Sequence, residues 1–168
     1  MKRLPFLKFL LVLIAPALLL AYSIAPDRVN LTGTWNLNES KSDLGNFARF
    51  TTRKIKVEQK DETITISKTS PSRGGEDVTT TETLSYDGKE SESTVFGSSK
   101  KKSTAKWSDD GTSFIVTYTV ALERNGETSN ITGTETWTLT SDGKSLSLQT
   151  VSTSTQGERT TKAVYDKE

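Results

Sequence analysis

The chain has 168 residues, with 22 basic and 21 acidic side chains, a formal net charge of +1, and neither histidine nor cysteine. The missing histidine and cysteine exclude Ser-His-Asp and Cys-His catalysis, the usual zinc ligand sets and disulfide bonds. We therefore expect that the protein is not an enzyme and that it binds no metal and no other cofactor. The balanced charge gives no electrostatic reason to bind nucleic acid, because nucleic-acid-binding proteins carry a clustered basic face.

Residues 1–25 have the pattern of a secretory signal peptide. Residues 1–8 carry three basic side chains and no acidic one, residues 9–21 are apolar, and Ser23-x-Ala25 supplies the small residues of a cleavage site, with cleavage after Ser23 as the alternative. The apolar stretch contains Pro16 and falls short of the roughly 18 residues of a spanning helix. We expect a secreted or periplasmic mature chain, 26–168, without a membrane span or a lipidated cysteine, and with 19 basic against 21 acidic residues.

From residue 31 onward the sequence predicts about ten β-strands joined by short turns. Asp-Gly and Asn-Gly pairs recur, as at 86–89, 109–112 and 124–127, and suit tight hairpin turns. Apolar and polar residues alternate between the turns, which predicts strands with one buried face. The predicted strands are 31–38, 50–59, 63–69, 77–86, 91–96, 102–108, 113–123, 128–140, 145–154 and 159–166.

Consecutive strands with short connections form either an up-and-down barrel or a sandwich. Barrel closure removes the exposed sheet edges that invite aggregation. We therefore expect one all-β domain over 26–168, an antiparallel up-and-down β-barrel of about 8–10 strands.

Three sequence segments resemble a known group of barrels. The Gly33-Thr34-Trp35 triplet at the start of the first strand resembles the opening of lipocalins and fatty-acid-binding proteins, and Tyr165 and Lys167 match the last strand of the latter. The whole chain is similar to secreted lipocalin-like proteins of bacteria in its "GTWNLNESKSDLG" run, its "KSTAKW" strand and its "VYDK" end. This resemblance implies a calycin-type barrel, in which the tryptophan packs across one end.

The chain also departs from the fatty-acid-binding proteins at two places. The position of the arginine that would bind a ligand carboxylate is Ala163 here. Only residues 39–49 separate the first two predicted strands, and two short helices, which that family has there, do not fit easily into this segment.

Seven residues are candidates for the ligand-binding barrel interior. Alternation places Glu82 and Glu135 on the inward face, and Arg53 continues the face of Ile55 and Val57. Buried charges must be paired or hydrated, so these groups indicate either recognition of a polar ligand head or an internal ion-pair network. With the aromatic residues, the candidates are Trp35, Arg53, Glu82, Trp107, Tyr118, Glu135 and Trp137; Trp35 is favoured as barrel-end core.

Two further polar patterns are interpreted as turns. The lysines at 100–102 are expected at a solvated hairpin end, where Lys101 could not serve Ser98 as a catalytic base. The aspartates at 109–110 precede a glycine and lack the further oxygen ligands that a calcium loop needs.

The sequence supports two functions. The first is a monomeric, secreted lipocalin-like protein that holds a small apolar or amphipathic ligand inside the barrel. The alternative is a filled barrel that acts as a structural or interaction protein of the cell envelope without a small-molecule ligand. An eight-stranded barrel can be filled by side chains or hold one small ligand, so the space inside discriminates between them.

Overall fold

The computed structural model describes residues 27–72, 74–96, 98–124 and 127–168, so the predicted signal peptide lies outside the described residues. Ten strands and two short 3₁₀ helices make up this part of the chain. In chain order they are β1 (Gly33–Leu37), η1 (Glu39–Lys41), η2 (Gly45–Phe50), β2 (Lys54–Gln59), β3 (Thr63–Pro71), β4 (Asp77–Ser85), β5 (Ser91–Val95), β6 (Ser99–Trp107), β7 (Ser113–Arg124), β8 (Glu127–Leu139), β9 (Ser145–Ser154) and β10 (Gly157–Lys167).

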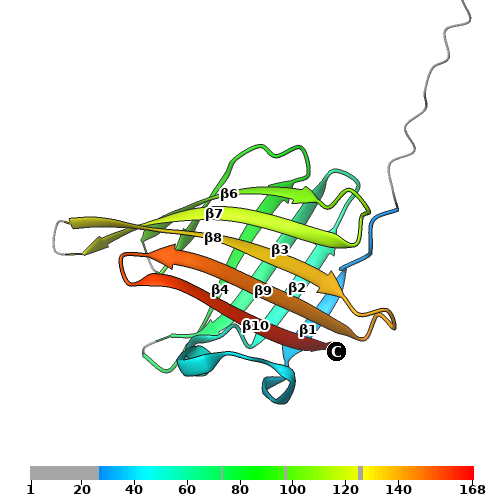
Figure 1. The fold of residues 1–168 in the computed structure, drawn as a ribbon, viewed down its shortest axis with the longest axis horizontal. Coiled ribbons are helices and arrows are strands. Elements are labelled where there is room, and N and C mark those ends of the chain that lie inside the picture. The colour runs from blue at the N-terminus through cyan, green and yellow to red at the C-terminus, as the bar shows by residue number, and fades with distance from the viewer. Residues whose placement is uncertain (1–26, 73, 97, 125–126) are drawn as a thin grey trace, which may run out of the picture.

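The strands form one antiparallel sheet that curls into a nearly closed barrel. Their order is β4-β3-β2-β1-β10-β9-β8-β7-β6-β5, so every hairpin joins neighbours and β1 pairs with β10. In Figure 1, strands β7 to β10 cross in front of β2 to β4, and the interior lies between them. The all-β barrel prediction is confirmed, and the sandwich alternative is excluded because one continuous sheet makes both walls.

The segment between β1 and β2 differs from the prediction. It forms η1 and η2, so the expectation that two short helices do not fit was wrong, and the strand predicted from residue 50 begins at Lys54. Asn38 Oδ1 accepts the backbone N–H of Lys41 at 3.2 Å and so caps η1. Asp166 of β10 attaches η1 to the barrel through a hydrogen bond and an ion pair. Its carboxylate accepts from Asn38 Nδ2 at 2.6 Å and lies 2.9 Å from Lys41 Nζ.

The hairpin turns follow from local hydrogen bonding. In the β6–β7 turn, Asp110 Oδ1 accepts from Ser108 Oγ at 2.6 Å and from the Thr112 N–H at 3.0 Å, as the turn interpretation of residues 109–110 requires. Gly111 has a φ of 70°, and a Cβ there would lie 2.6 Å from the carbonyl oxygen of Asp27. Glycine is therefore needed both for the turn and for the close approach of the N-terminal segment.

Residues 27–32 run across one end of the barrel before β1. The Gln59 side chain binds this segment through two backbone hydrogen bonds. Its Oε1 accepts from the Leu31 N–H at 2.9 Å, and its Nε2 donates to Val29 O at 3.2 Å. Trp35 Nε1 donates to Leu31 O at 3.0 Å. This end of the barrel is thereby sealed, with the indole fully buried, as predicted for the barrel-end tryptophan.

The apolar core fills the half of the barrel next to this sealed end. Each buried large side chain contributes about 1.5–3 kcal/mol relative to its exposed state. The fully buried large side chains are Leu31, Trp35, Ile55, Val57, Ile64, Ile66, Leu84, Phe114, Val116, Trp137, Leu146 and Tyr165. Among the described residues, no helix is long and apolar enough to cross a bilayer.

Candidate ligand-binding interior

The inward-facing side chains change from apolar to polar along the barrel axis. The strand register places Phe114, Trp137 and Leu148 in one row across the sheet, and Tyr118, Gly133 and Ser152 two rows further on. We call the second region the polar half; it comprises Lys68, Glu82, Lys101, Ser103, Tyr118, Gly133, Glu135 and the inward-facing residues between them.

A buried ion pair spans the interior of the polar half. Lys68 Nζ of β3 lies 2.7 Å and 2.8 Å from the two carboxylate oxygens of Glu135 on β8. The two side chains are 16% and 10% exposed. Trp137 Nε1 donates a further hydrogen bond to Glu135 Oε2 at 3.2 Å. The alternation correctly placed Glu135 inside, and the structure supplies the partner that a buried carboxylate needs.

A second buried pair joins β4 to β6. Lys101 Nζ lies 2.8 Å and 3.0 Å from the carboxylate oxygens of Glu82, and both side chains are 8% exposed. Ser103 Oγ donates to the same carboxylate at 3.3 Å. The prediction of a solvated hairpin end was therefore wrong for Lys101. Lys100 and Lys102 are solvated, as predicted, and pair with acidic side chains of the β4–β5 connection and β5, although they too lie within strand β6.

The two pairs act on each other electrostatically. Burial alone would lower the pKa of Lys68, but the negative charges of Glu135 and Glu82 outweigh it and raise the pKa. Burial would raise the pKa of Glu135, but the positive charges of Lys68 and Lys101 outweigh it and lower the pKa. The pair of Lys68 and Glu135 is therefore charged at neutral pH.

Tyr118 lies flat against the wall of the polar half because Gly133 leaves room for it. A Cβ at Gly133 would lie 2.6 Å from both Cζ and Oη of Tyr118 and 2.8 Å from the carbonyl oxygen of Val151. Lys101 Nζ sits 5.1 Å from the centre of the Tyr118 ring. Burial, together with the charge of Glu135, raises the pKa of Tyr118 to about 12, so its hydroxyl is a neutral donor and acceptor.

Solvent reaches the polar half, in contrast to the apolar core. Several side chains face inward by the strand alternation and are nonetheless partly exposed, among them Tyr118, Ile131, Thr150 and Ser152. Val78, at the start of β4, is 51% exposed although it shares the inward face of Glu82. The polar half therefore contains both apolar and hydrogen-bonding side chains that are partly exposed.

The seven predicted site residues do not all gather in this half. Glu82, Tyr118 and Glu135 line it, and Trp137 borders it. The remaining three lie elsewhere in the barrel wall and at its end. Sequence reasoning missed the lysine partners at 68 and 101, although each lysine continues the buried face of its own strand.

Trp35, Trp107 and Arg53 lie outside the polar half. Trp35 belongs to the sealed apolar end. Trp107 packs against Phe114 with ring centres 5.2 Å apart, close to the sealed end. Arg53 precedes β2, its side chain is 63% exposed, and its Nη1 lies 3.6 Å from a carboxylate oxygen of Asp77.

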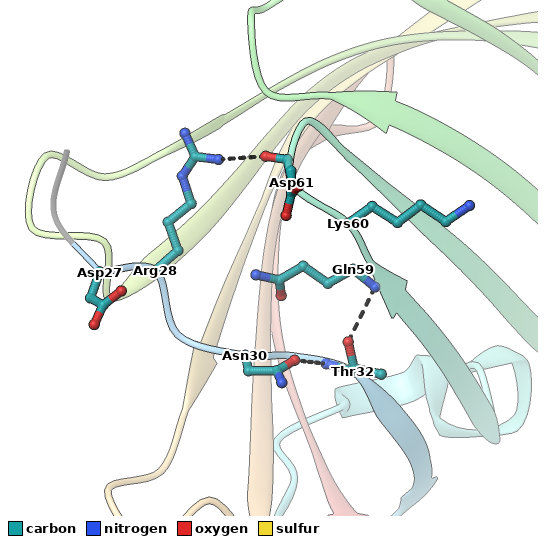
Figure 2. A pocket seen from close by; sticks show the side chains of 7 residues that line it. All are labelled: Asp27, Arg28, Asn30, Thr32, Gln59, Lys60 and Asp61. Carbon is teal, nitrogen blue, oxygen red and sulfur yellow. Dashed lines mark hydrogen bonds between the residues drawn. The ribbon is translucent and has the colours of Figure 1, made fainter.

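A surface hollow lies outside the barrel, where residues 27–32 pass the β2–β3 turn. It has a volume of about 500 Å³ and is lined by Asp27, Arg28, Asn30, Thr32, Gln59, Lys60 and Asp61 (Figure 2). Arg28 Nη1 donates to Asp61 O at 3.2 Å across it. A neighbouring hollow of about 280 Å³ shares Arg28 and includes Tyr86 and Trp107. The first hollow is lined by polar side chains and the second by polar and aromatic side chains, and neither includes a residue of the polar half.

Comparison with known proteins places the fold. No family model matches the chain, and no curated protein matches it. Among solved structures, the chain is similar to zebrafish ileal bile acid-binding protein complexed with cholic acid, with a TM-score of 0.50 and 15% sequence identity over 82% of this chain and 98% of that chain. At this identity the likeness concerns the fold alone, and it agrees with the predicted antiparallel β-barrel.

Proposed function

We propose that this protein is a binding module that holds one small amphipathic molecule in the polar half of its barrel. The observation that carries the proposal is the group of inward-facing but solvent-accessible side chains there. Pockets for small molecules combine apolar walls with a few convergent polar groups. The similar fold of the bile acid-binding protein, which is complexed with cholic acid, supports the same use of the barrel here.

The chemistry of the lining favours an amphipathic ligand. Val120, Ile131 and Val78 supply apolar surface on the inward face. The Tyr118 hydroxyl, which burial keeps neutral, supplies a donor beside them. We propose binding without turnover, because the sequence lacks histidine and cysteine and each interior lysine is paired with a glutamate.

The place of action is part of the proposal. The N-terminal pattern of residues 1–25 supports export and cleavage, which would put the barrel outside the cytoplasm. A secreted carrier or collector of amphipathic molecules is consistent with a fold that needs no disulfide. The monomeric state stays a prediction.

A fluorescence titration tests the proposed function. Chain 26–168 is titrated with the fluorescent amphiphile anilinonaphthalene sulfonate, and cholate and uncharged amphiphiles are then used to displace it. We expect saturable binding with one site, weakened about threefold to tenfold by Tyr118→Phe, which keeps the ring on Gly133 and removes one neutral hydrogen bond. Thr119→Val removes a hydroxyl from the outer face of the same strand and serves as the matched control. Binding that is absent, or equal in the two variants, would contradict the proposal.

A filled barrel that binds a partner through its surface is the second candidate function. Two observations favour it: the interior charges already satisfy one another, and the hollow of Figure 2 lies outside the barrel. A filled barrel has no interior site for the fluorescent probe, so this candidate predicts no interior binding that an amphiphile could displace. The same titration therefore distinguishes the two candidate functions.

A further inference from the structure

The barrel is closed by backbone hydrogen bonds everywhere except at one seam. Neighbouring strands are paired from β4 through β1 and β10 to β5, and β4 and β5 are the two ends of that order. These two strands lie side by side without a ladder between them. Ser91 Oγ donates to Thr83 O across the seam at 2.8 Å. The seam is therefore held by side chains.

The strongest contact across the seam is the buried pair of Glu82 and Lys101. β4 and β6 belong to the two opposite ends of the sheet order and contact each other directly, so the pair of Glu82 on β4 and Lys101 on β6 crosses the seam. Ser103 adds a hydrogen bond from the same strand. Buried ion pairs lose much of their Coulomb attraction to the cost of desolvation, and their charges regain hydration when they separate. This pair can therefore fasten the seam and still release it.

The contact between Tyr86 and Trp107 across the seam contains a second feature that weakens the closed state. Before the start of β5, Tyr86 of the β4–β5 connection meets Trp107 of β6 edge-on, with ring centres 5.9 Å apart. Trp107 Nε1 is buried, and its contact with the Tyr86 side chain falls short of hydrogen-bond geometry, so it is the one buried side-chain donor or acceptor in the described ranges without a hydrogen bond of standard geometry. An unsatisfied buried donor destabilises the closed state relative to one in which water reaches it.

We propose that the β4–β5 seam is a lateral opening of the barrel and that the Glu82–Lys101 pair is its latch. Opening here breaks no strand ladder, whereas separating β3 from β4 would break a ladder of nine residue pairs. The opened seam leads directly into the polar half, where Ser103 and Tyr118 lie opposite each other. The role as a ligand entrance rests on the proposed function; the opening itself does not.

Cross-linking across the seam tests the entrance. The chain contains no cysteine, so Thr83→Cys with Glu92→Cys places two unique thiols on the outer face on either side of the seam, for a short bismaleimide. Thr65→Cys with Thr83→Cys is the matched control, because these residues already face each other across the β3–β4 ladder with hydroxyls 3.0 Å apart.

A closed entrance slows binding and release equally. We expect the seam cross-link to slow both rates for anilinonaphthalene sulfonate in stopped-flow measurements by about tenfold or more, with the Kd nearly unchanged and the control cross-link without effect. Equal rates in the two cross-linked proteins would overturn the seam as an entrance. If the uncross-linked protein binds no probe, the proposed function fails, and hydrogen exchange then decides the latch.

Hydrogen exchange tests the latch without a ligand. Glu82→Gln with Lys101→Met removes the seam pair, and Lys68→Met with Glu135→Gln removes the other buried pair, which does not cross the seam. We expect the first double variant to speed exchange of the β5 amides about tenfold or more relative to those of β8 and β9, and the second to leave that ratio unchanged. The same ratio in both double variants would overturn the latch.

Discussion

Removing the lysine of the central ion pair tests the energetics of the polar half. Lys68→Met leaves the Glu135 carboxylate buried without its closest cation. Breaking one partner of a buried pair costs about 3–5 kcal/mol, whereas replacing both partners costs far less. We therefore expect Lys68→Met to lose about 3–5 kcal/mol of unfolding free energy at pH 7. The double variant with Glu135→Gln, which can still accept from Trp137, should lose about 1 kcal/mol.

The pH dependence gives this prediction its sign. In the wild type, the pKa of Glu135 lies below its ordinary value of 4.5, so its stabilisation is present above that value and is lost as the pH falls through the folded pKa. In Lys68→Met, burial should dominate and raise the pKa of Glu135, so that protonation relieves the unpaired charge as the pH falls. The difference in stability between variant and wild type should therefore shrink from pH 7 to about pH 4.5.

Urea unfolding at the two pH values measures this difference. The surface pair of Lys56 and Glu58, with the same kind of contact at 2.8 Å but exposed side chains, supplies the control Lys56→Met, for which we expect no measurable change. A loss for Lys68→Met no larger than for Lys56→Met, or one that stays constant with pH, would refute the reasoning.

Three other consequences can be measured on the same protein. Gly133→Ala should destabilise by about 1–3 kcal/mol in urea, because the new methyl group collides with Tyr118 and a backbone carbonyl, while Gly74→Ala, which meets only a serine hydroxyl at 3.6 Å, should change little; similar effects would contradict this packing. In an ultraviolet titration, Tyr118 should ionise only near pH 12. Because the pKa of the folded state is raised, the contribution of Tyr118 to stability is present below pH 10 and is lost above it. Normal ionisation near pH 10 in the folded state would contradict the burial of Tyr118. Trp107→Phe should cost less stability than Trp137→Phe, because of these two indoles only that of Trp137 makes a hydrogen bond of standard geometry. The reverse order in thermal melts would contradict that assignment.

The alternation of apolar and polar residues predicts the strands and the inward face well because it is a local property. It placed Glu82 and Glu135 inside, and both are buried. It also continues through the lysine run, where Lys101 points inward between two outward-facing lysines. That position was misjudged because β6 begins at Ser99 and not at 102, so the run belongs to the strand and not to the turn.

The partners of the buried carboxylates could not be predicted locally. Lys68 and Glu135 are 67 residues apart, and their meeting depends on how the sheet curls so that β3 faces β8. The prediction for Arg53 was wrong because a local pattern was extended too far. Its alternation with Ile55 was continued past the start of β2, where the face no longer points into the barrel. Short 3₁₀ helices such as η2 show no periodicity over several turns, so the pattern did not reveal them.

The most direct test of the central claim is a nitrogen-15 NMR titration of chain 26–168 with cholate and with an uncharged amphiphile. The account predicts that saturating shifts gather on the amides of Tyr118, Gly133 and Lys68, with those of the sealed end around Trp35 unmoved. Shifts confined to the outer hollow around Arg28 and Asp61, or no saturable shifts with either compound, would contradict a ligand site inside the barrel.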